Sequence, residues 1–350
     1  MEWRYNQFLG ESLSYEDIKN NPDNENFLVT DLKFTHDGSH VAVTDKGGRV
    51  IIFKKTVLPD KQPHLDYYFE FVAQESDFDV CKSIEYPEEV KAVSILKSPN
   101  YDNKLDILTA GYRTIKLDRI YKDTVKTFDN EEDSNGIIIP KLKEMQPEIK
   151  CKTKRLMRCI HADSINSLSL SKINENHFIS ADNYRVYLWD INREGKDIYT
   201  PIDISPKPDV ENAERITKAT FSESDPYVFY YGTDKGCINL CDLRIGSDQT
   251  RCQIRFTDEK SKMANVIVNS LQCVHDIKAP NQNDYCFATR QFFSVFLWDK
   301  RVTAEPSRKF LTYEPMITKL NYIYQKNYKN NRFFHNYHLA HHFPNQHYIL

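Results

Sequence analysis

The pattern of hydrophobic and polar positions repeats a short unit, which is most complete in residues 161–190. Apolar and polar residues alternate over 165–170, a polar turn follows, and residues 178–180 lead through a second turn to a stretch that ends in Trp189-Asp190. Alternation with period two is the pattern of a β-strand with one buried face. The segment therefore predicts three short antiparallel strands with a Trp-Asp end, which is typical of one blade of a WD-repeat β-propeller.

The same unit recurs in residues 29–53, 90–120, 216–244 and 268–301. The residue at the position of Trp189 varies among the copies, and we call this the anchor position. The five anchors are Phe53, Asp118, Trp189, Cys241 and Trp298. Successive positions in this set are 52 to 71 residues apart, longer than the usual WD period of about 40–45 residues. We therefore expect an all-β WD-repeat propeller of about five and a half blades with long insertions, the last half blade being residues 332–350.

The longest insertion, residues 121–160, begins acidic, passes an apolar stretch and ends basic. The apolar stretch is Ile137, Ile138 and Ile139, and the basic end contains Lys150, Lys152, Lys154, Arg155 and Arg158. Basic residues that alternate along a strand share one of its faces. A solvated loop is the alternative, but the pattern favours a projecting β-hairpin with one charged face toward a partner. A polar N-terminal arm is expected at residues 1–26, with the propeller over 27–350.

Composition limits the possible partners and the compartment. The chain has 350 residues, 28% of them charged, and a formal net charge of −3, so nothing in its bulk charge attracts nucleic acid or an anionic membrane. No run of about 18 apolar residues predicts a membrane span, and the N-terminus lacks the apolar core of a signal peptide. The eight cysteines form no CxxC pair. Cys237 and Cys241 could form a metal half-site, but buried reduced thiols are favoured, which indicates a cytoplasmic or nuclear protein.

No catalytic motif assembles in the sequence. The segments 45–48 and 234–237 (DKGG and DKGC) are expected to be turns in which glycine supplies a positive φ. His161 and Asp182 could be drawn as an acid–base pair, although His, Ser and Asp at such blade positions often form a structural network with the Trp. The histidines between 335 and 347 fit no metal-ligand spacing well. The sequence therefore favours a binding module without cofactor or metal.

Several stretches resemble the B-type regulatory subunits of protein phosphatase 2A. They are WRYNQFLG (3–10), VAVTDKGGRVIIF (41–53), DFDVCKSIEYPEEV (77–90), HADSINSLSLS through SADNYRVYLWD (161–190) and TDKGCINLCDLR (233–244). Their order and separations match the family over essentially the whole chain. The resemblance implies a seven-bladed propeller. Because the family continues beyond the position that corresponds to Leu350, we expect this chain to be truncated at its C-terminus.

The resemblance also implies a function. A family member is not an enzyme but binds the helical-repeat scaffold subunit and the catalytic subunit of the phosphatase, and it selects phosphoprotein substrates. The hairpin at about residues 125–160 corresponds to the family's scaffold-gripping handle. The positions that correspond to the family's substrate groove are Lys46, Phe78, Lys82 and Asp182, the last pairing with a basic residue of a helical substrate segment. Asp163, Asn212 and Arg215 depart from the family and would make this groove more polar.

Two other functions are compatible with a propeller of this pattern. One is a generic WD-repeat scaffold of another complex, such as a ubiquitin ligase or an RNA-processing assembly. The other is a degenerate pseudo-subunit that keeps the fold and has lost assembly. Capture by a phosphatase scaffold subunit would separate the regulatory subunit from both.

Overall fold

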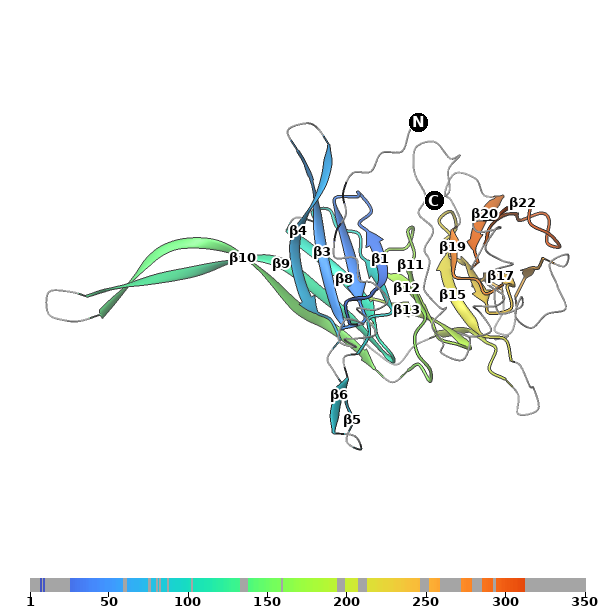
Figure 1. The fold of residues 1–350 in the computed structure, drawn as a ribbon, viewed down its shortest axis with the longest axis horizontal. Helices are drawn as coiled ribbons and strands as arrows, with labels where there is room; N and C mark the ends of the chain where they lie inside the picture. The colour runs from blue at the N-terminus through green and yellow to red at the C-terminus, as the bar shows by residue number, and fades with distance from the viewer. Residues whose placement is uncertain are drawn as a thin grey trace, which may run out of the picture. The chain divides into compact units, whose positions relative to one another are not determined.

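The structure is a computed structural model (Figure 1). It describes residues 7, 9, 26–58, 62–74, 77–79, 81, 83–86, 88–101, 103–132, 138–158, 160–193, 199–206, 213–245, 252–258, 272–278, 285–291 and 294–311. The side chains of residues 77–79, 84–86, 125–132, 138–146 and 311 are not among those described. No helix in these ranges is long and apolar enough to cross a membrane.

The described residues form five four-stranded antiparallel sheets, each built from four strands in chain order. The first sheet contains β1 (Val29–Phe34), β2 (His40–Asp45), β3 (Arg49–Val57) and β4 (Pro63–Val72). The second contains β7 (Ala92–Ile95), β8 (Lys104–Ala110), β9 (Thr114–Glu132) and β10 (Ile138–Arg158). The third contains β11 (Ser167–Leu170), β12 (His177–Ala181), β13 (Arg185–Asp190) and β14 (Tyr199–Asp203). The fourth contains β15 (Ile216–Phe221), β16 (Val228–Thr233), β17 (Ile238–Asp242) and β18 (Ile254–Phe256). The fifth contains β19 (Asp276–Lys278), β20 (Cys286–Arg290), β21 (Ser294–Asp299) and β22 (Arg308–Leu311).

These sheets are successive blades, which confirms the predicted all-β propeller. A small two-stranded sheet, β5 (Asp77–Asp79) with β6 (Ile84–Tyr86), lies between the first two blades in sequence. Residues 332–350, in which a further half blade was predicted, lie outside the described ranges. The chain divides into two compact units. The first contains the first two blades without the turn at residues 110–114, and the second contains that turn and the last three blades.

The fourth strand of every blade comes from a segment that lies between the repeated units predicted from the sequence. These strands are β4, β10, β14, β18 and β22. Each is the outer edge of its sheet and is partly exposed, so its residues lack the apolar alternation that revealed the inner three strands. The expected three-stranded unit is thus the buried part of a four-stranded blade.

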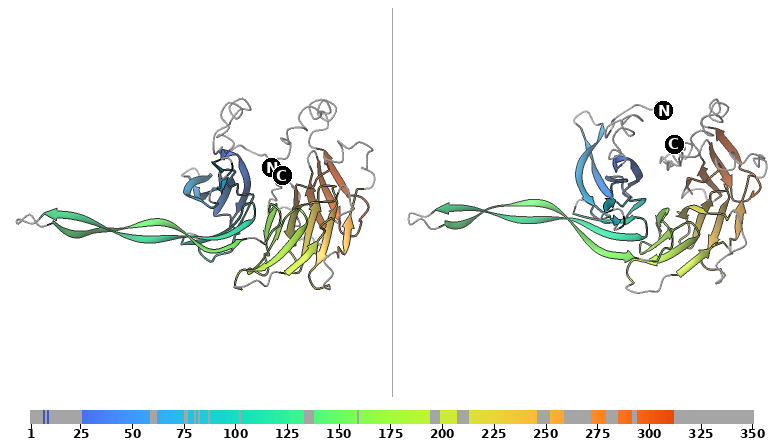
Figure 2. Two further views of the ribbon diagram at one scale, coloured as in Figure 1. Left: turned by 90° about the horizontal axis from the view of Figure 1, so that it is seen from below. Right: turned by 60° about the horizontal axis from the view of Figure 1, so that its bottom comes forward.

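The long hairpin also consists of strands that belong to a blade. β9 and β10 are the third and fourth strands of the second blade, extended to 19 and 21 residues. Figures 1 and 2 show the pair reaching far beyond β7 and β8 of the same sheet. The segment 121–160 is therefore not inserted between blades, because its basal part completes the second sheet. There Ile149 and Cys151 pack against the core of the first unit.

Strand register aligns the repeated anchor positions. Four of the five anchors lie opposite a second-strand residue, in the pairs Val41↔Phe53, Phe178↔Trp189, Phe229↔Cys241 and Phe287↔Trp298. Trp298 is completely buried and Trp189 is 5% exposed. The apolar clusters join neighbouring blades: one lies between the first and second, one between the third and fourth, and one between the fourth and fifth. The fourth blade, which is part of two of these clusters, therefore packs through both its faces.

Backbone hydrogen bonds also join neighbouring blades within each unit. A residue at the start of one blade donates its N–H to a carbonyl of the blade before, at the end of the second strand or in the turn that follows it. The bonds are Val90 to Asp45 (3.4 Å), Ile165 to Tyr112 (3.0 Å), Ile216 to Asn183 (2.7 Å) and Val274 to Thr233 (3.1 Å). A first-strand side chain often adds a second tie, as where Asn166 donates to the Ile216 carbonyl at 3.0 Å.

Glycine is required in two of these turns, as expected from the DKGG and DKGC segments. Gly48 and Gly236 have φ values of +83° and +79°. A Cβ on Gly48 would lie 2.8 Å from the carbonyl oxygens of both Gln74 and Glu88. The turn at Gly48 therefore needs glycine for two reasons: its φ is positive, and neighbouring backbone approaches it closely.

The second blade carries a buried carboxyl at its anchor position. Asp118 is 2% exposed. One of its oxygens accepts a hydrogen bond of 2.6 Å from Thr153 on β10, and the other has no partner among the described residues. Burial raises the pKa of this carboxyl, against the lowering effects of the Thr153 hydroxyl and the nearby Lys116.

Replacing Asp118 by Asn is expected to stabilise the protein at neutral pH. The folded-state pKa lies above the unfolded value of about 3.9, so the native state loses stability as pH rises from the unfolded to the folded pKa, and the loss persists above it. Removing the charge should raise the free energy of unfolding by about 1–3 kcal/mol at pH 7 and much less at pH 3, measured by urea denaturation. Asp123→Asn, at an exposed carboxylate paired with Lys150, serves as the control and should give no gain. An equal effect of Asp118→Asn at both pH values would contradict this account.

Candidate functional site

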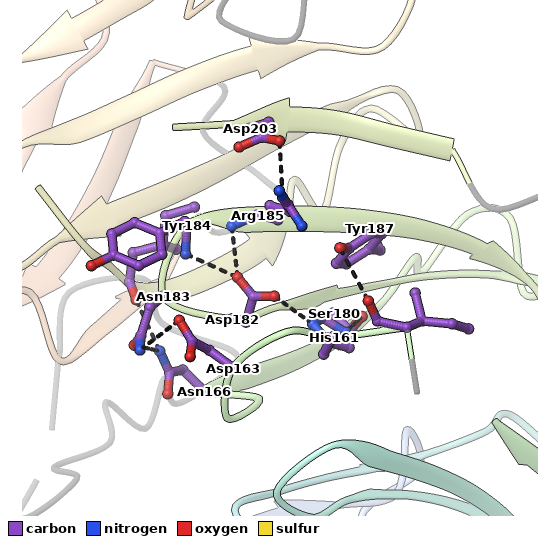
Figure 3. Close-up of polar contacts among 12 residues, drawn as sticks. His161, Asp163, Asn166, Ser180, Asp182, Asn183, Tyr184, Arg185, Tyr187 and Asp203 are labelled. Atoms are coloured by element: carbon purple, nitrogen blue, oxygen red, sulfur yellow. Dashed lines mark hydrogen bonds and ion pairs between the residues drawn. The ribbon is translucent and has the colours of Figure 1, made fainter. Parts of the chain in front are cut away.

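The turn between β12 and β13 is the best-defined polar site of the second unit, and Figure 3 shows its contacts. Asp182 closes this turn. Its Oδ1 accepts hydrogen bonds from the backbone N–H groups of Tyr184 (2.9 Å) and Arg185 (2.7 Å). This is the Asx geometry by which an Asp side chain replaces a backbone turn bond. The second oxygen of Asp182, Oδ2, lies 3.0 Å from Nδ1 of His161.

A buried chain of hydrogen bonds continues from that histidine. Nε2 of His161 lies 2.7 Å from the Ser180 hydroxyl, which also accepts a 2.7 Å hydrogen bond from the indole N–H of Trp189. One assignment satisfies every group: Nδ1–H donates to Asp182, and the Ser180 hydroxyl donates to Nε2. His161 is 4% exposed and Asp182 is 2% exposed. The geometry is thus that of a structural network and not that of an accessible acid–base pair.

The structure places Asp182, the predicted substrate contact, inside the blade. Both of its oxygens are used inside the blade, and a side chain 2% exposed cannot form a solvent-accessible ion pair without opening the turn. Its counterpart in the first blade is Asp45, which is 3% exposed and pairs with Arg49 at 2.7 Å. The pattern therefore marks a turn-closing aspartate, and the residues that the turn presents are its neighbours.

Those neighbours form the accessible part of the site. Asn183 and Tyr184 are half-buried at the tip of the turn. Asn166 donates to Oδ1 of Asn183 at 3.0 Å, and Asn183 in turn lies 3.4 Å from Oδ2 of Asp163. Asp163, noted as a departure from the family, is thus held in a polar cluster with two asparagines (Figure 3).

The equivalent end of the fourth blade has charges that are already paired. Glu214 accepts hydrogen bonds from Arg255 at 3.0 and 3.1 Å and from the Thr233 hydroxyl at 2.6 Å. Asp234 accepts from the Arg215 backbone N–H at 3.0 Å, and burial raises the pKa of its carboxyl. The Arg215 side chain itself is exposed. Glu214 and Arg255 are 41 residues apart, so no local sequence pattern could have joined them.

The other predicted groove residues lie in the first unit. Lys46 is half-buried at the tip of the turn between β2 and β3, and its backbone N–H donates to the Leu28 carbonyl at 3.0 Å. Phe78 lies in β5, with its side chain outside the described part. Lys82 and Asn212 lie outside the described residues. The structure therefore gives the side-chain surroundings of Lys46 and Asp182 alone among the four predicted groove positions.

The basic residues of β10 are divided between its two faces. Lys150, Lys152 and Lys154 alternate along one face, where Lys150 pairs with Asp123 at 2.9 Å and Lys154 lies 3.7 Å from Asp106. Arg155 lies on the opposite face with Met157, and it is half-buried. The side chains of Ile138 and Ile139 are not described, and Ile137 lies outside the described residues.

The described cysteines are reduced, and no metal centre is found among the described side chains. Seven cysteines are free, with Cys237, Cys241 and Cys273 buried. Burial raises the pKa of the Cys273 thiol to about 12. No group of three or more His, Cys, Asp or Glu side chains within the described ranges could hold a metal ion.

Replacing Ser180 by Ala tests the buried network. The change leaves the Trp189 N–H and His161 Nε2 without partners, and two unsatisfied buried groups should cost about 2–4 kcal/mol of unfolding free energy. Thr289→Val in the fifth blade is the matched control, because Thr289 accepts only the Trp298 N–H, at 2.9 Å. Urea denaturation followed by tryptophan fluorescence should show about half the loss for the control. A neutral Ser180→Ala would show that the network does not stabilise the blade.

No protein-family model matches the chain. Curated proteins match over most of its length. The 55 kDa regulatory subunit of protein phosphatase PP2A from Drosophila melanogaster is 28% identical over 315 residues, covering 85% of this chain and 62% of that protein. Regulatory subunit sur-6 of Caenorhabditis elegans phosphatase 2A is 28% identical over 346 residues, 93% of this chain and 67% of that protein. The gamma isoform of the human 55 kDa regulatory subunit of phosphatase 2A is 27% identical over 314 residues, 85% and 69% of the respective chains.

These relatives are regulatory rather than catalytic subunits, and the chain spans about two thirds of their length, between 62% and 69% for the three named. The repeated blades with their Trp-Asp anchors agree with the WD-repeat propeller that the homology implies. The chain is therefore a distant homologue of the 55 kDa regulatory subunits of protein phosphatase 2A.

Proposed function

We propose that this chain is a regulatory subunit of serine/threonine protein phosphatase 2A. In this role it binds the scaffold and catalytic subunits and selects phosphoprotein substrates. The observation that carries the proposal is the homology to regulatory subunits over 85–93% of the chain. The free cysteines suit a reducing compartment, so we place its action in the cytoplasm or the nucleus.

Docking to the scaffold is assigned to the β9–β10 hairpin. A two-stranded arm longer than its sheet offers an extended surface to a partner, and one face of β10 presents Lys150, Lys152 and Lys154. Lys150 already has a carboxylate neighbour on β9 and Lys154 has one on β8, while Lys152 is exposed. Exposed charges of this kind determine partner choice and orientation more than affinity. Ile137, Ile138 and Ile139 are proposed to supply apolar contacts nearer the tip.

Substrate selection is assigned to the turns between the second and third strands and to the β5–β6 segment. Lys46, Phe78 and Lys82 are proposed as contacts on the first unit, and Asn183 and Tyr184 on the second. Asp182 contributes by holding the β12–β13 turn, because both its oxygens are engaged within the blade. With Asp163 and Arg215 added, these turns have a polar character, so a substrate segment with polar as well as charged side chains is expected.

Shortening the hairpin tests scaffold docking. Residues 125–148 are replaced by an Asn-Gly turn, which keeps the basal strands and the Asp118–Thr153 contact. Purified phosphatase 2A scaffold subunit should capture the full chain, and capture by the shortened variant should be lost. Lys152→Glu should weaken capture by up to about fivefold, and Arg308→Glu on β22 of the other unit serves as the charge-matched control. Failure of the full chain to be captured would favour a generic WD-repeat scaffold or a non-assembling pseudo-subunit. Undiminished capture by the shortened variant would reject the hairpin assignment alone.

Replacing Lys46 by Glu tests substrate selection. The side chain is half-buried at a turn tip and away from the hairpin in sequence, so scaffold capture should be unchanged. Dephosphorylation of individual phosphoproteins by the reconstituted complex should change by up to about fivefold, differently for different substrates, as measured by phosphate release. Identical rates for every substrate tested would remove Lys46 from the proposed groove.

A further inference from the structure

The outer edge of the first blade is an unusually long strand. β4 (Pro63–Val72) has ten residues and pairs with β3 on one side only. Five of its residues are aromatic or aliphatic within 67–72, and Tyr67 and Val72 are 62% and 61% exposed. An edge strand leaves alternate N–H and C=O groups unused by its own sheet, and a long apolar edge readily accepts another strand.

One side chain from the start of the chain is seated on this edge. Nε2 of Gln7 donates to the Leu65 carbonyl at 3.0 Å, and the Leu65 N–H donates to Oε1 of Gln7 at 2.9 Å. A primary amide carries a donor and an acceptor like those of a peptide group. The two bonds therefore reproduce the paired N–H···O contacts that an added antiparallel strand would make with Leu65. The residues are 58 positions apart in sequence, so the contact is tertiary.

We propose that the outer edge of β4 is a strand-addition site and that its occupant is the N-terminal segment of this chain that carries Gln7. The site is bounded on one side by Pro63, which has no N–H to offer an added strand. Alternation from Leu65 makes the backbone of Tyr67 the next position that faces outward. Occupation by the chain's own segment covers an edge that would otherwise accept a foreign extended peptide.

The surroundings of the site select a neutral amide. Nε2 of Gln7 also lies 3.4 Å from Nε2 of His64, whose ring nitrogen is 3.4 Å from the Asp66 carboxylate. A carboxylate in place of the amide would oppose the Leu65 carbonyl and add to the negative charge of Asp66. An apolar side chain would leave both backbone groups of Leu65 without their partner. An amide, like a peptide group, satisfies the donor and the acceptor together.

Hydrogen exchange of the full chain tests the proposal. Gln7→Met removes both bonds with little change of side-chain length, and exchange of the Leu65 amide should become about tenfold faster. Exchange across β2 (His40–Asp45) should stay the same. Gln253→Met is the same chemical change at an exposed glutamine of the other unit, and it should leave the Leu65 amide unaffected. Unaltered exchange of Leu65 in Gln7→Met would overturn the proposal.

A second experiment supplies the N-terminal segment as a separate peptide. A chain that lacks residues 1–10 should exchange quickly over 63–68, and a synthetic peptide of residues 1–12 should restore protection there. The same peptide with Met in place of Gln7 should not. Equal protection by both peptides would show that the amide does not recognise the edge. If the shortened chain does not fold, the Gln7→Met comparison in the full chain decides alone. Neither experiment requires the phosphatase, so a negative result for strand addition leaves the proposed function unchanged.

Discussion

The hydrogen bond from the first residue of one blade to the preceding blade's turn is the constraint on which the other features depend. It appears at four blade junctions, with N···O distances from 2.7 to 3.4 Å. The accepting carbonyl lies at the end of the second strand or in the turn that follows it, so the conformation of that turn is coupled to the position of the next sheet. A turn that served only its own hairpin could vary freely, whereas these turns cannot. Gly48 and Gly236 with their positive φ values, and the turn-closing Asp45 and Asp182, meet this requirement by different means.

The same coupling explains why the candidate site has two layers. The inner layer, from Asp182 through His161 and Ser180 to Trp189, is buried and fully hydrogen-bonded. The outer layer, represented by Asn183, is half-buried and free to differ in chemistry because the inner layer holds its backbone. A turn built in this way can change its surface chemistry without changing the fold. The polar cluster of Asp163, Asn166 and Asn183 is such a change.

The outer strands follow a different logic. They pack against one neighbour only, so their length is not limited by the blade core. β10 extends together with β9, the third strand of its blade, as a long arm, and β4 has ten residues. Extension exposes strand edges and their backbone groups, and local contacts stabilise these exposed parts. Asp118 and Thr153 join the two strands at the base of the arm, and Gln7 covers part of the edge of β4.

The sequence by itself determined the repeating unit, its inner three strands and the anchor positions, because burial of one face imposes a period that can be read along the chain. It also determined the glycine turns and, through resemblance, the protein family. Tertiary structure decided what depends on groups distant in sequence. The fourth strands lack a strong apolar period because they are half-exposed edges. Asp182 is engaged inside the blade because His161, 21 residues earlier, binds its second oxygen. Arg155 lies on the face of β10 opposite to the lysines, the face that also carries Cys151 and Met157. Gln7 and Leu65 came together only in three dimensions, since a side-chain amide that imitates a peptide group leaves no periodic signal in the sequence.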